Sequence, residues 1–370
     1  MITTPVVVDV RPGAIADLDT LLADQRISTQ GSVAVVAGAR SGPVLTAGLR
    51  PKLPGADWFS VADGTVDAAV RLATEAKGGS YDAIVGIGGG KVLDVTKYAA
   101  ARLGLPMVAV ATNLAHDGIG SPVSTLDNDA GRGSYGVPAP IAVVVDLDLI
   151  RRAPDRSVRA GIGEVLSNLS AIADWELAHR VNGEEIDGLA VTFARTAAES
   201  VLHHPGTVRD DDFLRTLAEA LVLGGLAMVV AGTSRPSSGA CHEISHAIDL
   251  ELPGRRCYHG EQVGVGAAFA SFLREQEAGS STGDSAGAAG HGGDGGMFDA
   301  ISTALHRHRL PVGPADLGLD STEFARILRR APDTRPGRYT ILEHSGIGTG
   351  TDDGNRIVAL VRNYATAIGR

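Results

Sequence analysis

The chain has 370 residues, of which 21% are charged and 4% aromatic, and its formal net charge is −10. This length suits one large domain or two medium ones. The negative charge argues against nucleic acid or an anionic membrane as a partner. With only Cys241 and Cys257, no signal-peptide pattern and no long apolar run, we expect a cytoplasmic protein without a membrane span.

The first 150 residues alternate short apolar segments with helical patterns. This rhythm predicts a Rossmann-like α/β domain over residues 1–150, with a parallel sheet covered on both faces. Helical patterns lie at Asp17–Gln25 and Gly64–Lys77. The predicted strands are Val6–Val10, Ser32–Ala37, Trp58–Val61, Ala83–Ile87, Met107–Ala111 and Ile141–Asp146.

A glycine turn, Gly88–Gly90, follows the strand Ala83–Ile87 and precedes a helical pattern. Glycines let backbone N–H groups approach a phosphate, and the start of a helix favours its negative charge. The turn lacks the GxGxxG spacing, and a purely structural turn is the alternative. The charged neighbours Lys91 and Asp94 favour a site for a nucleotide pyrophosphate.

A second polar loop follows the strand Met107–Ala111. In this loop Thr112 and Ser121 could hydrogen-bond a nucleotide, and Asp117 could bind a substrate hydroxyl. The alternative is that Asp117 only caps the next helix.

Cofactor specificity is expected at the end of the second strand, where an acidic residue would bind the ribose 2′-hydroxyl of NADH. The chain instead has Arg40 and Ser41, which could accept a 2′-phosphate. We therefore predict that NADPH is used at least as well as NADH.

From residue 151 onward long helical patterns replace the strands, which predicts a helical domain over 151–370 that binds metal and substrate. The segment 278–296 is rich in Gly and Ser, and we expect a flexible loop there. The active cleft is expected between the two domains. The helical patterns are Arg159–His179, Glu185–His204, Asp211–Gly232, Cys241–Leu250, Gln262–Glu277, Met297–His308, Ser321–Arg330 and Asp353–Ile368.

Histidines cluster in the second half of the chain. His242 and His246 are four residues apart, on one face of a helix, and His259 follows after a turn. Three protein ligands and an open position are typical of a catalytic metal site, and Glu164 could supply a carboxylate. An isolated HxxxH pair can also simply pack or cap, but the HGE segment at His259 and the glycine turn favour a metal site. We interpret Cys241 as a packing residue.

Six segments together resemble the sn-glycerol-1-phosphate dehydrogenase family, within the superfamily of iron-containing alcohol dehydrogenases, glycerol dehydrogenases and dehydroquinate synthases. They read GIGGGKVLDVTKY, TNLAHDGIGSPVS, RAGIGEVLSNLSAIADWELA, SRPSSGACHEISHAIDLELP, HGEQVGVG and RPGRYTILEH, and they extend from Val85 to His344. The triple glycine is common to the superfamily, whereas the other motifs are specific to the glycerol-phosphate branch.

The resemblance implies reduction of dihydroxyacetone phosphate by NAD(P)H to sn-glycerol 1-phosphate. It implies that Glu164, His242 and His259 bind a divalent metal ion, zinc first, with nickel or iron as alternatives. Asp117, Glu164 and His246 would contact the substrate, with Asp117 and His246 as the catalytic pair. With the glycine turn, the predicted cofactor contacts are Gly88, Gly89, Gly90, Lys91, Val92, Leu93, Asp94, Thr112, Asn113, Leu114, Ala115 and Ser121.

One residue departs from the family pattern, because Glu164 stands where the family usually has aspartate and where dehydroquinate synthases have glutamate. Two alternatives therefore stay open: a sugar-phosphate cyclase that uses NAD transiently, and a reductase of a related phosphorylated or phosphonylated aldehyde. The partner is a small phosphorylated substrate, for which Arg235 is a candidate phosphate ligand. We also expect a homo-oligomer.

Overall fold

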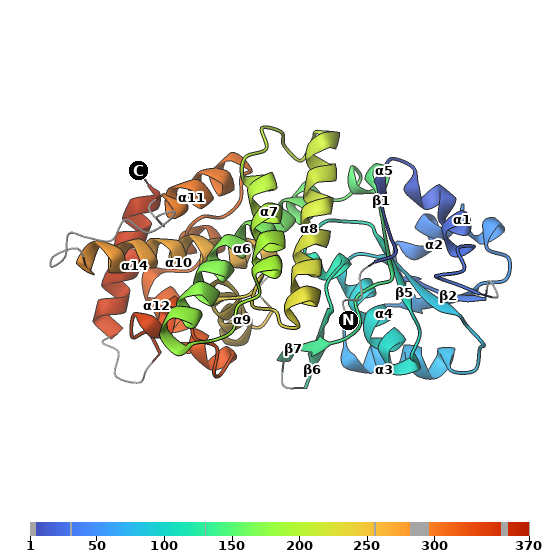
Figure 1. Ribbon diagram of the computed structural model, residues 1–370, viewed down its shortest axis with the longest axis horizontal. Helices are drawn as coiled ribbons and strands as arrows, with labels where there is room; N and C mark the ends of the chain where they lie inside the picture. The colour runs from blue at the N-terminus through green and yellow to red at the C-terminus, as the bar shows by residue number, and fades with distance from the viewer. Residues whose placement is uncertain are drawn as a thin grey trace. The chain divides into compact units, whose positions relative to one another are not determined.

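The computed structural model describes residues 5–29, 32–129, 131–254, 257–281, 296–348 and 354–369. Contacts between residues divide the chain into two compact units (Figure 1). The first contains Met1–Gly161 and Gly206–Gly232, and the second contains Ile162–Pro205 and Thr233–Arg370.

The first unit is built on a sheet of six parallel strands in the order β1-β8-β5-β4-β2-β3. Its central strands are apolar and buried on both faces, as expected for a parallel sheet. All six predicted strands and the predicted α/β class are confirmed. The strands are β1 (Val7–Arg11), β2 (Val33–Gly38), β3 (Asp57–Val61), β4 (Ala83–Gly88), β5 (Met107–Ala111) and β8 (Ala142–Asp146).

The strand order reverses between β2 and β4. From β2 the chain moves outward to β3, then returns to β4 on the other side of β2 and continues to β5 and β8. Ligands of such sheets bind outside the carboxyl ends of the strands at this reversal. Gly88, the last residue of β4, lies there, paired with Ala111 at the end of β5.

Helices cover both faces of the sheet. Leu18 and Leu22 join the apolar cluster on one face, and Gly86 of β4 lies against Thr96 on the other.

The hairpin β6 (Val123–Asn128) and β7 (Gly131–Gly136) was not predicted, because its glycine-rich second strand lacks an apolar alternation. The helices of this unit include α1 (Leu18–Leu22), α2 (Gly42–Thr46), α3 (Val66–Ala76), α4 (Gly90–Leu103), α5 (Leu147–Ile150) and α8 (Asp211–Ala231).

Helix α8 groups with the sheet, whereas the sequence predicts a single boundary after residue 150. The physical reason is close packing: a Cβ on Gly225 would lie 2.5 Å from the carbonyl carbon of Gly120. Arg215 of α8 also donates to the Val10 carbonyl of β1. By length and composition α8 could cross a membrane, but 61% of its apolar window is buried inside the molecule, as in the core helix of a folded domain.

The second unit is formed by long helices, and each helical pattern predicted after residue 150 corresponds to a helix. Of the expected loop 278–296, the first residues, to Ser281, belong to α10 and Gly296 is the N-cap of α11, while residues 282–295 lie outside the described part of the chain. The helices are α6 (Asp155–Asn182), which begins in the first unit, α7 (Gly188–Leu202), α9 (Ala240–Glu251), α10 (His259–Ser281), α11 (Met297–Arg307), α12 (Ser321–Arg330), α13 (Ile341–His344) and α14 (Gly354–Ile368).

A buried carboxylate joins several of these helices. Asp174 of α6 is fully buried and accepts hydrogen bonds from the backbone N–H groups of Ala240, at 2.7 Å, and Ile341, at 2.8 Å. Arg274 of α10 forms an ion pair with the same carboxylate. Asp174 therefore holds the starts of α9 and α13 and the middle of α10 against α6.

We expect Asp174→Asn to lower the free energy of unfolding by about 3–5 kcal/mol, because it leaves the Arg274 guanidinium buried without a counter-charge. Denaturant titration followed by circular dichroism measures the change. The matched control is Asp333→Asn, which removes an exposed ion pair with Arg330 and should cost at most about 1 kcal/mol. Equal midpoints for Asp174→Asn and the wild type would refute the structural role of this carboxylate.

Candidate metal centre

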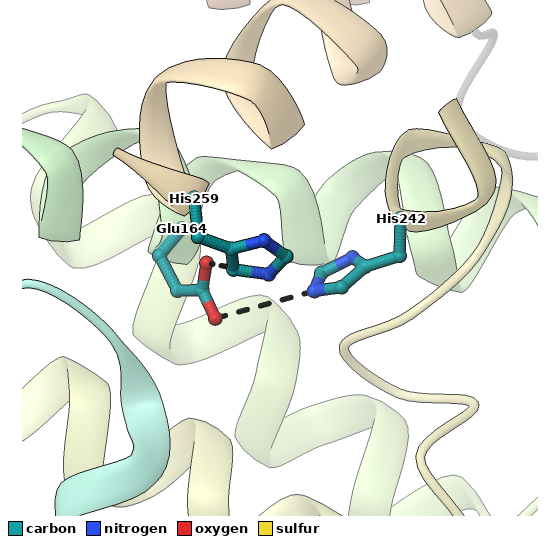
Figure 2. A group of neighbouring side chains, drawn as sticks. All are labelled: Glu164, His242 and His259. Atoms are coloured by element: carbon teal, nitrogen blue, oxygen red, sulfur yellow. Dashed lines mark ion pairs between the residues drawn. The ribbon is translucent and has the colours of Figure 1, made fainter. Parts of the chain in front are cut away.

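Three side chains from three helices of the second unit converge, as Figure 2 shows. Glu164 comes from α6, His242 from α9 and His259 from the first position of α10. The Nε2 atom of His242 lies 4.0 Å from Oε1 of Glu164, and Nε2 of His259 lies 3.7 Å from Oε2. One nitrogen or oxygen atom from each residue lies within 4.8 Å of those of the other two.

These distances suit a shared ion better than direct hydrogen bonds. An N–H···O hydrogen bond spans about 2.7–3.2 Å, whereas two ligands about 2.1 Å from a tetrahedral ion lie about 3.4 Å apart. Two imidazoles and a carboxylate form a donor set found in catalytic zinc sites. The arrangement can therefore hold a divalent ion and leave a position for substrate.

The electrostatics favour the ligating form of His242. Burial lowers the pKa of His242 well below its usual range, and the positive charges of His259 and Arg335 lower it further. The imidazole is therefore neutral near pH 7, as a metal ligand must be.

Three side chains set the orientation of His259. Asp249 accepts from Nε2 of Gln262 at 3.0 Å, which turns the Gln262 carbonyl oxygen towards Ser245. Ser245 donates to that oxygen at 2.6 Å, so its hydroxyl oxygen accepts from Nδ1 of His259 at 3.0 Å. This chain of bonds places the His259 proton on Nδ1 and leaves the lone pair of Nε2 facing Glu164.

Glycines allow the three helices to approach closely enough for these side chains to meet. A Cβ on Gly163 of α6 would lie 2.0 Å from the carbonyl oxygen of Gly260 on α10. A Cβ on Gly266 of α10 would lie 2.7 Å from the carbonyl oxygen of Cys241 on α9.

Burial raises the pKa of Cys241 to about 12, so its thiol stays protonated and provides no thiolate ligand.

His246, the other histidine of the HxxxH pair, lies beside the cluster. Its ring centroid is 6.4 Å from that of His242 and 6.2 Å from that of His259. Arg335 donates to Nε2 of His246 at 3.1 Å. The structure thus groups His242 with Glu164 and His259, and places His246 next to them, where a substrate contact is possible.

The glycine turn of the first unit touches the polar loop that follows β5. A Cβ on Gly89 would lie 2.5 Å from Nδ2 of Asn113, and a Cβ on Gly90 would lie 1.9 Å from Nε2 of His116. Gly89 is the N-cap of α4. The first N–H groups of a helix have no partner within it, so this turn can present them to a phosphate.

Several of the predicted cofactor residues are buried in this structure. Leu93 and Leu114 are fully buried, and the Asp94 carboxylate lies 3.4 Å from the buried ammonium group of Lys97. Lys97 also donates to the Ser121 carbonyl at 3.3 Å, and Ser121 itself is buried. Lys97, which pairs with Asp94, therefore helps to hold this loop against α4.

Asp117 does not cap the helical turn that follows it. That position belongs to His116, whose Nδ1 accepts from the Gly118 N–H at 2.9 Å. Burial raises the pKa of Asp117, opposed by His116 and Lys97, and no hydrogen bond to its carboxylate is present among the described residues. The other ring nitrogen of His116, Nε2, lies against Gly90, where a Cβ would be 1.9 Å away.

Known proteins are similar to this chain in fold and in sequence. Residues 9–154 match the family of iron-containing alcohol dehydrogenases. The structure of glycerol dehydrogenase from Schizosaccharomyces pombe superimposes with a TM-score of 0.74 at 18% identity, over 100% of this chain and 91% of that one. An iron-containing alcohol dehydrogenase from Thermococcus thioreducens gives a TM-score of 0.70 at 16% identity, over 98% of each chain. The fold is that of the iron-containing alcohol dehydrogenase class.

Sequence relatives define the branch. The glycerol-1-phosphate dehydrogenase (NAD(P)+) of Hyperthermus butylicus is 34% identical over 94% of both chains. That of Methanothermobacter thermautotrophicus is 34% identical over 91% of both. This chain belongs to the glycerol-1-phosphate dehydrogenase family.

We expect Ser245→Ala to weaken metal binding by about 10–100-fold, because loss of a partner that orients a ligating histidine has effects of this size. The measurement is metal release to a chromophoric chelator, monitored at equilibrium. The control is Ser271→Ala on α10, which removes a buried hydroxyl that forms no hydrogen bond with any described residue. The same metal affinity in Ser245→Ala and Ser271→Ala would contradict the role assigned to Ser245.

Proposed function

We propose that the protein is a metal-dependent NAD(P)H oxidoreductase that reduces dihydroxyacetone phosphate to sn-glycerol 1-phosphate. The observation that carries this proposal is the convergence of Glu164, His242 and His259 in a chain that belongs to the glycerol-1-phosphate dehydrogenase family. The family supports NAD(P) and a metal ion as cofactors, and we infer zinc because of the imidazole and carboxylate donors.

When bound, the nicotinamide supplies a hydride and the metal ion supplies Lewis-acid polarisation of the carbonyl group. Glu164, His242 and His259 would hold the metal ion. The first amides of α4, at Gly90 and Lys91, would bind the pyrophosphate of the cofactor.

The chain's own polar groups complete the reaction. The raised pKa of Asp117 and its lack of a protein hydrogen bond in the described structure suit a residue that binds a substrate hydroxyl. His246 lies beside the ligand rings and can hold a proton on either nitrogen. We assign it the delivery of a proton to the oxygen of the reduced product.

We further infer a cytoplasmic location, supported by two cysteines that form no disulfide with each other. The negative net charge supports a small-molecule substrate and argues against nucleic acid or a membrane as partner. A homo-oligomer remains a prediction, to be measured by light scattering in solution.

We expect His259→Ala to lose bound metal and NADPH-dependent ketone reduction together, while its circular dichroism spectrum stays that of the wild type. Metal content by emission spectroscopy and absorbance of the reduced cofactor provide the two readouts. The control is the exposed His306→Ala on α11, which should keep both. Full turnover by metal-free His259→Ala would exclude the mechanism, and product formation without net NADPH consumption would indicate a cyclase.

We expect the wild type to use NADPH at least as well as NADH. Arg40 is exposed and follows the end of β2, the strand that pairs with β4. Its guanidinium can pair with the 2′-phosphate. Arg40→Ala should lower kcat/KM for NADPH by about tenfold or more, the effect of one charged hydrogen bond, and leave that for NADH unchanged. The exposed Arg71→Ala serves as control. A strong NADH preference in the wild type would overturn this assignment.

A further inference from the structure

Several arginines of the second unit lie near the histidine cluster, and one of them is neutralised. Arg235 is buried, and its Nε and Nη2 atoms both bond to the Glu184 carboxylate. Its remaining terminal nitrogen, Nη1, donates to the Tyr339 carbonyl at 3.0 Å. The charge of Arg235, the phosphate ligand suggested by the sequence, is therefore already neutralised by Glu184.

Arg335 and Arg338 differ from Arg235 in that neither is paired with an acidic side chain among the described residues. Both donate to the hydroxyl oxygen of Ser234, at 3.2 Å and 3.1 Å respectively. Arg335 also donates to His246, and Arg338 to the carbonyl of Ser238. Within the described chain, neither guanidinium forms an ion pair with a carboxylate.

The two guanidiniums are held in a setting that disfavours their charges. Burial lowers the pKa of Arg335, and the pKa of Arg338 falls to about 10, first through burial and then through repulsion by Arg335. The negative charge of Glu243 acts on both guanidiniums, but its carboxylate accepts a hydrogen bond from the Thr340 hydroxyl, at 3.0 Å, and forms no ion pair with Arg335 or Arg338. Two like charges that share one serine oxygen would gain from an added anion.

The pair also borders the candidate metal centre. Arg335 contacts His246 directly, and the His246 ring lies beside those of His242 and His259. An anion held by the two arginines would therefore belong to a molecule that also reaches the metal centre.

We propose that Arg335 and Arg338 bind the phosphate group of the substrate. Each planar guanidinium has more N–H donors than its bonds to Ser234, His246 and Ser238 use. A phosphate monoester offers three acceptor oxygens and a charge near −2, which matches two guanidiniums. A neutral hydroxymethyl group in the same place would leave both charges uncompensated. The assignment of the rest of the substrate rests on the proposed function.

The first test measures the anion site without catalysis. Inorganic phosphate is titrated into the metal-loaded protein by calorimetry. We expect the wild type to bind phosphate, and Arg335→Ala and Arg338→Ala to bind it at least tenfold more weakly. Arg330→Ala, which removes an exposed arginine on α12, is the matched control and should bind as the wild type does. Unchanged binding in both alanine variants would overturn the proposal.

The second test separates phosphate recognition from general damage. For Arg338→Ala we expect kcat/KM for dihydroxyacetone phosphate to fall by about 100-fold, while that for unphosphorylated dihydroxyacetone changes by less than about threefold. An equal fall for both ketones would mean a structural role and would refute the proposal. If Arg338→Ala does not fold, Arg338→Lys is used, because it keeps the charge but lacks the planar guanidinium. Its kcat/KM should fall by about tenfold for dihydroxyacetone phosphate and stay unchanged for dihydroxyacetone.

The two tests also keep this proposal distinct from the proposed function. If the wild type reduces neither ketone, the proposed reaction fails. The calorimetric comparison of Arg335→Ala and Arg338→Ala with Arg330→Ala still decides whether these arginines form an anion site.

Discussion

The Asp174 carboxylate receives donors from three separate segments, and each of these segments carries part of the candidate site. Its bond to Ala240 fixes the start of α9, which carries His242 and His246. Its pairing with Arg274 fixes α10, which begins at His259. Its bond to Ile341 fixes the segment that follows Arg335 and Arg338. A buried ion pair is weak evidence for net stability, so we interpret this carboxylate as a device that sets relative positions.

Close backbone contacts complete what Asp174 begins. Gly163 lies directly before Glu164 and Gly260 directly after His259, and a Cβ on Gly163 would lie 2.0 Å from the carbonyl oxygen of Gly260. A side chain at Gly163 would separate the helices by more than the tolerance of a metal site, which is well below one ångström in catalysis. The hydrogen-bonded chain from Asp249 through Gln262 and Ser245 then sets the rotation of the His259 ring. Helix spacing and ring orientation are thus controlled by different residues.

Much of this arrangement could be predicted from the sequence, and the parts that could not have a common cause. The strands of the parallel sheet and the long helices follow from apolar periodicity, which is a local property, whereas the glycine-rich hairpin β6–β7 and the short helices α2, α5 and α13 were not predicted from it. Glu164, His242 and His259 could be selected because histidine and carboxylate side chains stand within recognisable motifs. Arg335 and Arg338 also stand in a quoted motif, RPGRYTILEH, but their role could not be assigned from it, because what distinguishes them from Arg235 is that neither pairs with a carboxylate among the described residues. Glu184, which neutralises Arg235, is 51 residues away in the chain, and nothing in the local sequence indicates which arginine it selects.

The net charge of −10 makes the local arginine pair necessary for an anionic substrate. The long-range field of such a protein repels a phosphate ester, although salt limits this repulsion to about 8 Å at physiological ionic strength. Inside that range the partly buried guanidiniums act through a medium of lower dielectric constant, where each charge has a larger effect than in water. The neighbouring arginines Arg235 and Arg274 are both paired with carboxylates, whereas Arg335 and Arg338 form no such pair among the described residues. An anion of charge −2 is therefore favoured beside these two guanidiniums, and an uncharged ketone gains nothing from them, which makes selectivity for phosphorylated substrates a consequence of how the arginines are paired.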